Sequence, residues 1–245
     1  MMKSVVDGRC DFLNFYKYPS DMPVAGKYDI PVFKGIRLKH PERYQLVAFD
    51  EAHLIPQSQR KKYIVHFFIY DYKFERVWTY LNKNTEWLKQ FAAVIQPDFS
   101  LYVDMPKAMQ IWNAWRANFM AWWWQNEGIK VISNCYWTDR ESFEFCFGSM
   151  PKNSCICVSS KGSYTDDRKF NKAQANKESI ALQNSNFRQG LETMIETLKP
   201  RQILWLGPKI DWADDLMEYY NIEVIHIKHR RIYQERLDKL NNNNS

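Results

Sequence analysis

Four acidic residues that follow hydrophobic, strand-like segments are the groups in this chain best suited to chemistry. They are Asp50, Glu51, Asp71 and Asp98. Carboxylates held close together repel one another, which raises the pKa of one of them toward neutrality and makes it a general acid or base. Grouped carboxylates can also bind a hard divalent cation through their oxygens. The structural alternative is that each one caps the helix after its strand. We predict a catalytic role for the four and assign no metal ligands.

A second set of side chains near the same segment ends is suited to holding a substrate. It consists of Arg76, Ser100, Asn134, Trp137, Ser159 and Lys161. Of these, the cationic Arg76 and Lys161 would contact phosphate. A long polar stretch, residues 160–186, begins here, and we expect it either to close over the site as a lid or to be disordered. The chain has 8 glycines and lacks the glycine-rich phosphate and dinucleotide motifs, so no cofactor is assigned.

Strands and helices alternate along the chain from residue 44 onward, and this alternation positions both sets. Strands are predicted at residues 44–49, 63–70, 92–96, 129–133, 154–159, 202–206 and 222–227. Helices are predicted at residues 72–90, 105–127, 139–147, 187–199, 211–220 and 229–240. Such alternation is typical of βα units with parallel strands. Parallel sheets carry their ligand and catalytic groups at the carboxyl ends of the strands, which predicts one common rim for both sets.

The predicted fold class is α/β, with a mainly parallel sheet in a (βα)-barrel-like arrangement; an open doubly wound sheet is the alternative. An eighth strand of a barrel would have to come from the N-terminal region. The connection 50–62 is too short for a comfortable helical crossover between parallel strands, which is the main objection to a barrel. We expect residues 1–43 to form an irregular cap, 44–240 a single α/β domain and 241–245 a disordered tail.

Composition narrows the class of partner. The net charge of +6 and the pI near 8.9 fit an anionic partner, either nucleic acid or nucleotide. Aromatic residues make up 16% of the chain, which is enough for a large core and for stacking on bases. The five cysteines have no disulfide-scaffold spacing, and no segment has the character of a signal peptide or a membrane span. We therefore expect a reduced, cytoplasmic protein with no membrane partner, whose oligomeric state is not predicted.

Several segments between residues 44 and 208 together carry a resemblance. They are 49–52, 66–78, 97–106, 110–113, 128–132 and 143–148, with Trp137. The combination resembles a family known only as a domain of unknown function, found in phages, prophages and other bacterial mobile elements. The chain departs from the family pattern at Tyr70, where the family has a second acid, and at Ser133, where it has proline. The resemblance implies a mobile-element setting and no particular activity.

Two functions fit these observations. The first is an enzyme that acts on a nucleotide or nucleic acid through the acidic residues at the strand ends. The second is a non-catalytic nucleic-acid-binding or replication-associated protein, which would use exposed indoles and the basic C-terminal segment that contains Arg230 and Arg231. A protein of a mobile element that blocks a host factor is a third possibility.

Overall fold

The central element is a parallel sheet of eight strands. The computed structural model describes residues 22–165, 177–235 and 238. The strand order is β10-β3-β4-β5-β6-β7-β8-β9, and every neighbouring pair is parallel. The strands are β3 (Gln45–Ala48), β4 (Tyr63–His66), β5 (Ala93–Ile95), β6 (Val131–Asn134), β7 (Cys155–Ser159), β8 (Gln202–Leu206), β9 (Glu223–Ile225) and β10 (His229–Arg230). The predicted parallel α/β fold is confirmed.

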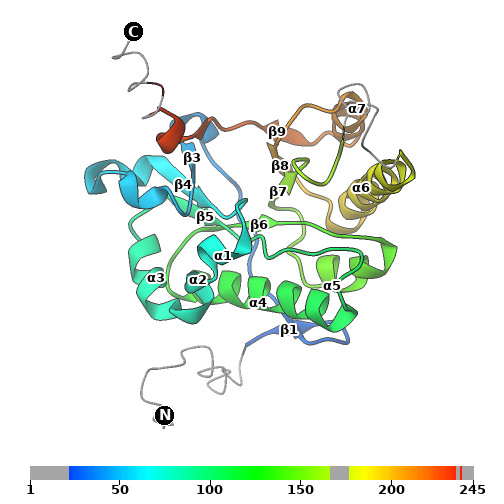
Figure 1. The fold of residues 1–245 in the computed structure, drawn as a ribbon, viewed down its shortest axis with the longest axis horizontal. Coiled ribbons are helices and arrows are strands. Elements are labelled where there is room, and N and C mark those ends of the chain that lie inside the picture. The colour runs from blue at the N-terminus through cyan, green and yellow to red at the C-terminus, as the bar shows by residue number, and fades with distance from the viewer. Residues whose placement is uncertain (1–21, 166–176, 236–237, 239–245) are drawn as a thin grey trace.

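The sheet curls because its two edges are consecutive in the chain. Strand β9 ends at Ile225 and β10 begins at His229, yet the two strands lie at opposite ends of the strand order. Four steps between Cα atoms cover at most about 15 Å. The chain makes this short passage from β9 toward β3 at the top of Figure 1. The two edges therefore lie near each other, and the sheet is barrel-like, as predicted.

Two expectations about this closure were wrong. The eighth strand does not come from the N-terminal region, whose strands β1 (Val24–Ala25) and β2 (Ile30–Pro31) form a separate antiparallel pair. It is β10, which lies where a helix over residues 229–240 was predicted. The Leu46 N–H donates to the Lys228 carbonyl at 2.9 Å, so pairing with β3 holds this segment extended until a helical turn begins at residue 232. Residues 241–245, predicted as a tail, lie outside the described residues.

The short β3–β4 connection, which was the objection to a barrel, contains no α-helix. Two 3₁₀ helices fill it, η3 (Ala52–Leu54) and η4 (Gln57–Lys62). A 3₁₀ helix rises about 2 Å per residue, more than an α-helix, so a few residues suffice to return the chain to the start of the next parallel strand.

Besides the helical turn that begins at residue 232, the α-helices α1 to α7 lie outside the curled sheet (Figure 1). They are α1 (Asp71–Phe74), α2 (Arg76–Thr79), α3 (Leu81–Leu88), α4 (Lys107–Asn126), α5 (Phe143–Phe147), α6 (Lys177–Leu198) and α7 (Asp211–Tyr219). A 3₁₀ turn, η5 (Arg140–Ser142), precedes α5, and another, η2 (Pro41–Arg43), precedes β3. No helix of the described residues is long and apolar enough to cross a membrane.

Apart from the C-terminal segment, the largest differences from the predicted helix bounds occur at two helices. The helix expected at 72–90 is divided into α1, α2 and α3. Strand β4 ends at His66 rather than at residue 70, and residues 67–70 form an irregular link between β4 and α1. Helix α6 begins at Lys177, ten residues earlier than predicted, and so takes up part of the stretch 160–186 that was expected to be a lid or disordered. Its first ten residues have three adjacent apolar side chains, Ile180, Ala181 and Leu182, among polar ones. They lack an apolar stripe at helical spacing, which is why no helix was predicted there. Residues 166–176 lie outside the described residues.

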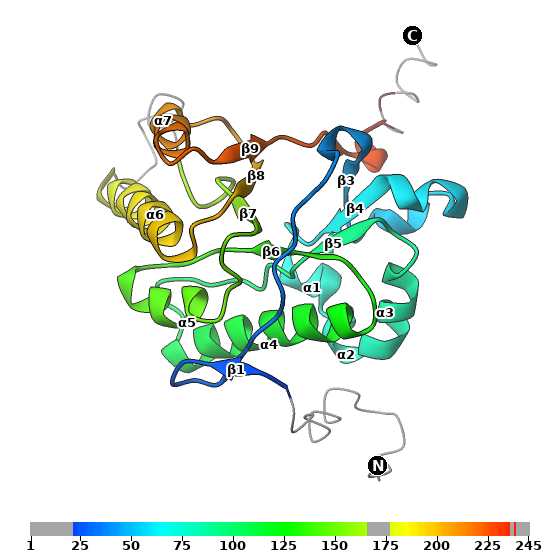
Figure 2. The same cartoon turned by 180° about the vertical axis from the view of Figure 1, so that it is seen from behind.

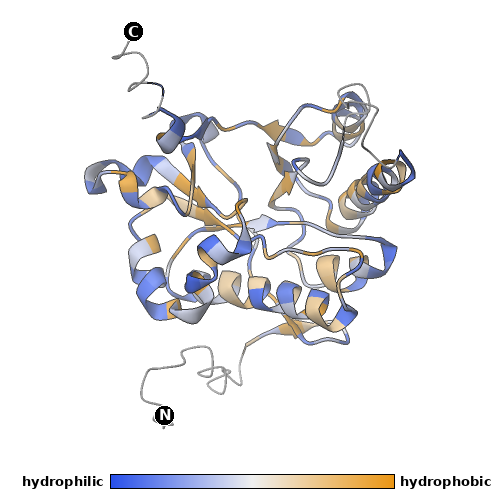
Figure 3. Cartoon of the chain, viewed as in Figure 1, coloured by the Kyte–Doolittle hydropathy of each residue, from blue (hydrophilic) through white to orange (hydrophobic). Residues whose placement is uncertain are grey.

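The sheet separates two hydrophobic cores. Inward-facing residues fill the space inside the curl, and they include Leu46, Ile64, Ile95, Ile132, Cys155, Cys157, Leu204 and Ile225. Alternate residues of the same strands, such as Val47, Val65, Val94, Val131, Ile156 and Ile203, pack outward against the helices. Figure 3 shows the strands as the most hydrophobic part of the ribbon, while the helices carry polar residues on their outer sides. Both faces of the parallel sheet are thus buried.

The N-terminal segment closes the amino end of the curl. It runs from β1, beside α4, across the back of the sheet to β3, which Figure 2 shows from that side. Leu38 enters the inner core, and its backbone N–H and carbonyl both bond to the side chain of the buried Gln202, at 2.8 and 3.1 Å. With this end plugged, the carboxyl end is the open mouth of the curl.

Candidate functional site

The predicted site residues gather at one end of the sheet, although they come from separate segments. Asp50, Asp71 and Asp98 follow β3, β4 and β5, and Asn134 and Ser159 are the last residues of β6 and β7. All eight strands are parallel, so these residues share the carboxyl end. Asn134 pairs with the inward-facing Cys157, and Ser159 lies two residues beyond that cysteine, so both belong to inward-facing positions.

Asp98 and Asn134 form the central pair of this mouth. The Asn134 amide nitrogen donates to Asp98 Oδ1 at 2.8 Å. Burial raises the pKa of Asp98 to about 6; the nearby Asp71 carboxylate also raises it, and the Asn134 hydrogen bond opposes them. A carboxyl with this pKa exchanges its proton near neutral pH, which suits a general acid or base.

Asn134 is held in a fixed orientation and keeps an unused acceptor. Its backbone N–H donates to Gln96 Oε1 at 3.1 Å, and the Gln96 amide is in turn bonded to Asn118 at 2.5 Å. Asn134 is only 2% exposed, yet its Oδ1 has no hydrogen-bond partner within the described residues, and neither does the hydroxyl of the neighbouring Tyr136. Buried polar atoms are normally paired, so this oxygen is available to a ligand or a water.

A small cavity adjoins the pair. Its volume is about 40 Å³, and it is lined by Asp98, Asn134, Cys135, Tyr136, Trp137, Ser159, Lys161, Ser163 and Phe187. This space holds about one water molecule and is too small for a nucleobase. A substrate would thus present a single group to Asp98 from the mouth, or would displace part of the wall.

Part of that wall is supplied by Trp137, a predicted substrate-binding residue. Its indole stacks on Phe187 of α6 at a centroid distance of 5.6 Å and donates to the Asn186 carbonyl at 3.0 Å. Trp137 thus connects the segment after β6 with α6 and is held by packing rather than free to stack on a base.

Asp71 is occupied by a structural contact. Its two carboxylate oxygens accept from the Ser100 backbone N–H at 3.1 Å and from the Ser100 hydroxyl at 2.8 Å. The Ser100 carbonyl accepts from Asn113 of α4 at 2.7 Å. Asp71 and Ser100 together hold the segment after β5, which carries Asp98. Asp71 also acts on Asp98 through its charge, as described above.

The other two predicted catalytic acids lie farther along the rim, in contacts of their own. Asp50 forms an ion pair with Lys73 at 2.8 Å. The Glu51 carboxylate accepts from the Ile232 backbone N–H at 2.6 Å, at the start of the helical turn after β10. Asp98 is thus the member of the four that lines the small cavity, beside Asn134.

Two predicted phosphate-binding cations lie in different surroundings. Arg76 is exposed on α2, with its guanidinium 4.8 Å from the centroid of the Phe49 ring. Lys161 is exposed just after β7 and lines the cavity beside Asp98. Its backbone N–H donates to Ser159 Oγ at 3.3 Å. Lys161 rather than Arg76 is therefore the cation closest to the central pair.

Sequence reasoning missed a histidine pair at the same mouth. His66, the last residue of β4, is buried, as expected of a core histidine, but its Nε2 lies 2.8 Å from Nε2 of His229 in β10. The two residues are 163 positions apart. No local spacing could have joined them, since His229 was expected to lie in a helix.

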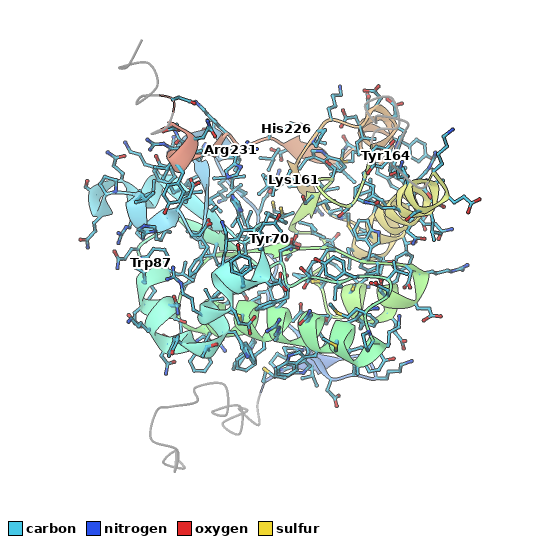
Figure 4. The ribbon with its side chains drawn as sticks, viewed as in Figure 1. Tyr70, Trp87, Lys161, Tyr164, His226 and Arg231 are labelled. Atoms are coloured by element: carbon cyan, nitrogen blue, oxygen red, sulfur yellow. The ribbon has the colours of Figure 1, made fainter. Side chains whose placement is uncertain are left out.

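Two exposed tyrosines also mark this end of the sheet. Tyr70 and Tyr72 are 73% and 77% exposed, and their rings stack at a centroid distance of 5.9 Å with planes 12° apart. Figure 4 places Tyr70 near the centre of the molecule in that view, below Lys161.

A larger cavity lies at the other end of the sheet. It has a volume of about 750 Å³ and is lined at the amino ends of β8 and β9 by residues that include Arg37, Lys199, Arg201, Tyr220 and Glu223. Its charges are partly neutralised within the wall, where Arg37 and Glu223 lie 3.5 Å apart. Parallel sheets place catalytic groups at the carboxyl ends of their strands. We therefore assign the site to the cavity beside Asp98, although it is the smaller of the two. Among the residues described, no group of three or more His, Cys, Asp or Glu could hold a metal ion.

Comparisons with known proteins identify relatives in phages. The chain is 34% identical over 152 residues to the Gene 1 protein of Mycobacterium phage L5, and 32% identical over 216 residues to the Gene 1 protein of Mycobacterium phage D29. These alignments cover 62% and 87% of this chain, and 60% and 71% of the respective relatives. No solved structure matches the chain. The model of the domain of unknown function DUF4417 matches residues 22–227, and the chain therefore belongs to this family.

Proposed function

We propose that this protein is an enzyme that acts on a nucleotide or nucleic acid at the mouth of the curled sheet, with Asp98 as general acid or base. The observation that carries the proposal is the Asp98–Asn134 pair, which combines a carboxyl of pKa about 6 with a buried, unused amide oxygen. A carboxyl of this kind can move a proton at neutral pH. The amide oxygen can accept a hydrogen bond from a polar group of the substrate.

Two features support a nucleotide over other substrates. The exposed, stacked rings of Tyr70 and Tyr72 offer a flat aromatic surface on which any nucleobase can stack. The exposed Lys161 offers a positive charge beside the cavity, suited to a phosphate group. Asp71, Ser100 and Trp137 support the site by fixing the segments that carry or enclose Asp98, while Asp50 and Glu51 lie toward the outer rim.

The proposal is tested by product analysis. The protein is incubated with nucleoside mono-, di- and triphosphates and with short single-stranded DNA and RNA, and the products are identified by mass spectrometry. We expect one class of these compounds to be converted. If the compounds bind without any being converted, the second function, non-catalytic nucleic-acid binding, replaces the first.

We predict that Tyr70→Ala weakens the binding of single-stranded oligonucleotides. Stacking on an aromatic side chain is worth about 1–3 kcal/mol per base, so the dissociation constant should rise about 5- to 150-fold. Fluorescence anisotropy with a labelled oligonucleotide measures this change. Tyr219→Ala is the matched control, because Tyr219 lies on α7 and is 82% exposed. Equal affinities for the two variants would remove the tyrosines from the binding surface.

A further inference from the structure

The histidine pair has defined proton positions. The Phe68 backbone N–H donates to His66 Nδ1 at 3.2 Å, so this nitrogen is an acceptor and the neutral ring carries its proton on Nε2. The Nε2–H of His66 then donates to His229 Nε2, 2.8 Å away. His229, when neutral, must carry its own proton on Nδ1. The result is a fixed ring that presents one N–H donor away from His66.

The charges around this pair are positive. Burial lowers the pKa of His66 most, and His229 and Lys161 lower it further. The pKa of His229 is lowered first by burial and then by Arg231 and Lys161. Both cations thus act on His229, although Lys161 follows β7 and Arg231 follows β10. Figure 4 shows the labelled Lys161 and Arg231 at the upper part of the mouth.

No carboxylate neutralises these cations within the described part of the chain. Lys161 and Arg231 are exposed, and neither makes an ion pair there. The adjacent Arg230 differs, since it is bonded to Glu235 at 3.0 Å and to the Tyr63 hydroxyl at 2.6 Å. The mouth therefore gathers an ammonium, a guanidinium and an imidazole N–H for which the described residues supply no partner, and a group with several anionic oxygens can accept from all three.

We propose that Lys161, His229 and Arg231 form a phosphoryl-binding subsite at the mouth of the curled sheet, with His66 as a positioning residue that fixes the His229 ring. The identity of the whole ligand, a nucleotide whose reacting group reaches Asp98, rests on the proposed function. Phosphoryl binding itself needs no turnover. Lys161 also lines the cavity that contains Asp98, so it joins the two parts of the site.

The test measures equilibrium binding of inorganic phosphate by calorimetry at constant ionic strength. The wild-type protein should bind phosphate, and Lys161→Gln and Arg231→Gln should each weaken binding about 10-fold or more, as expected for the loss of one hydrogen bond to a charged group. Lys39→Gln is the matched control, because Lys39 is exposed near Leu38 at the closed, amino end. Unchanged binding in both mouth variants, or an equal loss in the control, overturns the proposal.

A second measurement examines the imidazoles directly. In a ¹⁵N-labelled protein, phosphate should shift the Nδ1 resonance of His229 and leave the exposed His40 and His53 unaffected. His66→Phe keeps a buried ring but removes the Nε2–H donor, so it should reduce the fraction of His229 with its proton on Nδ1, an effect that a loss of packing alone would not cause. Equal shifts at all exposed histidines, or an unchanged His229 tautomer in the variant, would contradict the assigned roles.

The same variants separate this inference from the proposed function. Phosphate binding that depends on Lys161 and Arg231, without conversion of any nucleotide, would sustain the subsite and remove the enzyme. Turnover that depends on Asp98, with phosphate affinity unchanged in the Lys161 and Arg231 variants, would do the reverse. The affinities of a nucleoside monophosphate and of an oligonucleotide are then compared in Lys161→Gln. The ligand that loses more affinity shows whether the bound phosphoryl group belongs to a monoester or to a nucleic-acid backbone.

Discussion

Asp98→Asn is expected to abolish turnover and, at the same time, to make the folded protein more stable above pH 6. An amide cannot exchange a proton as a carboxyl does. The rate of substrate turnover should therefore fall about 100- to 10,000-fold, the usual contribution of a general acid or base. The hydrogen bond with Asn134 can persist, because an amide oxygen accepts as a carboxylate does.

The direction of the stability change follows from the pKa. The pKa of Asp98 in the folded chain is about 6, against an ordinary value of 3.8. A raised pKa contributes stability that is fully present below the ordinary value and is lost as the pH rises through the folded-state value. The difference between these two pKa values corresponds to a free energy of unfolding of roughly 3 kcal/mol. This is the upper limit of the stability that Asp98→Asn gains over the wild type at pH 7.5.

Urea unfolding of wild type and variant at pH 5 and pH 7.5 measures this difference. The variant should gain on the wild type as the pH rises between these values. Asp215→Asn, an exposed residue on α7, is the matched control and should show no such gain. A difference between Asp98→Asn and wild type that stays constant with pH would show that Asp98 is an ordinary, solvated carboxyl.

The second large effect is expected at a glycine of α6. A Cβ added to Gly190 would lie within the indole of Trp137, which contributes to the wall of the cavity beside Asp98. Gly190→Ala must therefore displace the indole and break its hydrogen bond to the Asn186 carbonyl. Overpacking of this kind costs about 1–3 kcal/mol, which exceeds the gain of up to about 1 kcal/mol from the better helix propensity of alanine.

Thermal unfolding and tryptophan fluorescence measure this effect. We expect a lower melting temperature and a changed emission spectrum for Gly190→Ala, together with weaker substrate binding because the cavity wall moves. Ser185→Ala, an exposed position on the same helix, should leave all three unchanged. A Gly190→Ala variant as stable as the wild type would mean that Trp137 does not pack tightly against α6.

The sequence was most informative where a pattern repeats over several residues. The alternation of strand-like and helical segments predicted the parallel sheet, and the parallel sheet in turn predicted that Asp98, Asn134 and Ser159 share one end. Both inferences depend on periodicity and on a topological rule, and neither requires a specific distant contact.

The parts that were missed depend on contacts between distant segments. Strand β10 has two residues, and its pairing with β3 cannot be read from its polar sequence. The pair of His66 and His229 follows from that pairing. The division of residues 72–90 into three helices likewise depends on tertiary packing, which overrides helix propensity.

The roles of the acids could not be separated from sequence either. Asp50, Asp71 and Asp98 all follow strands, and capping or catalysis fitted each of them. Only coordinates distinguish Asp71, which binds Ser100, from Asp98, which faces Asn134 and the cavity. A difference of a few ångströms in where a carboxylate points leaves no trace in local composition.

The most direct test of the account is a crystal structure of the protein soaked with a nucleoside monophosphate. We expect the nucleotide at the mouth of the curled sheet, with its phosphate against Lys161 and a polar group within hydrogen-bonding distance of Asp98 or Asn134. A nucleotide bound instead in the larger cavity near Arg37 and Tyr220, with the mouth unoccupied, would contradict it.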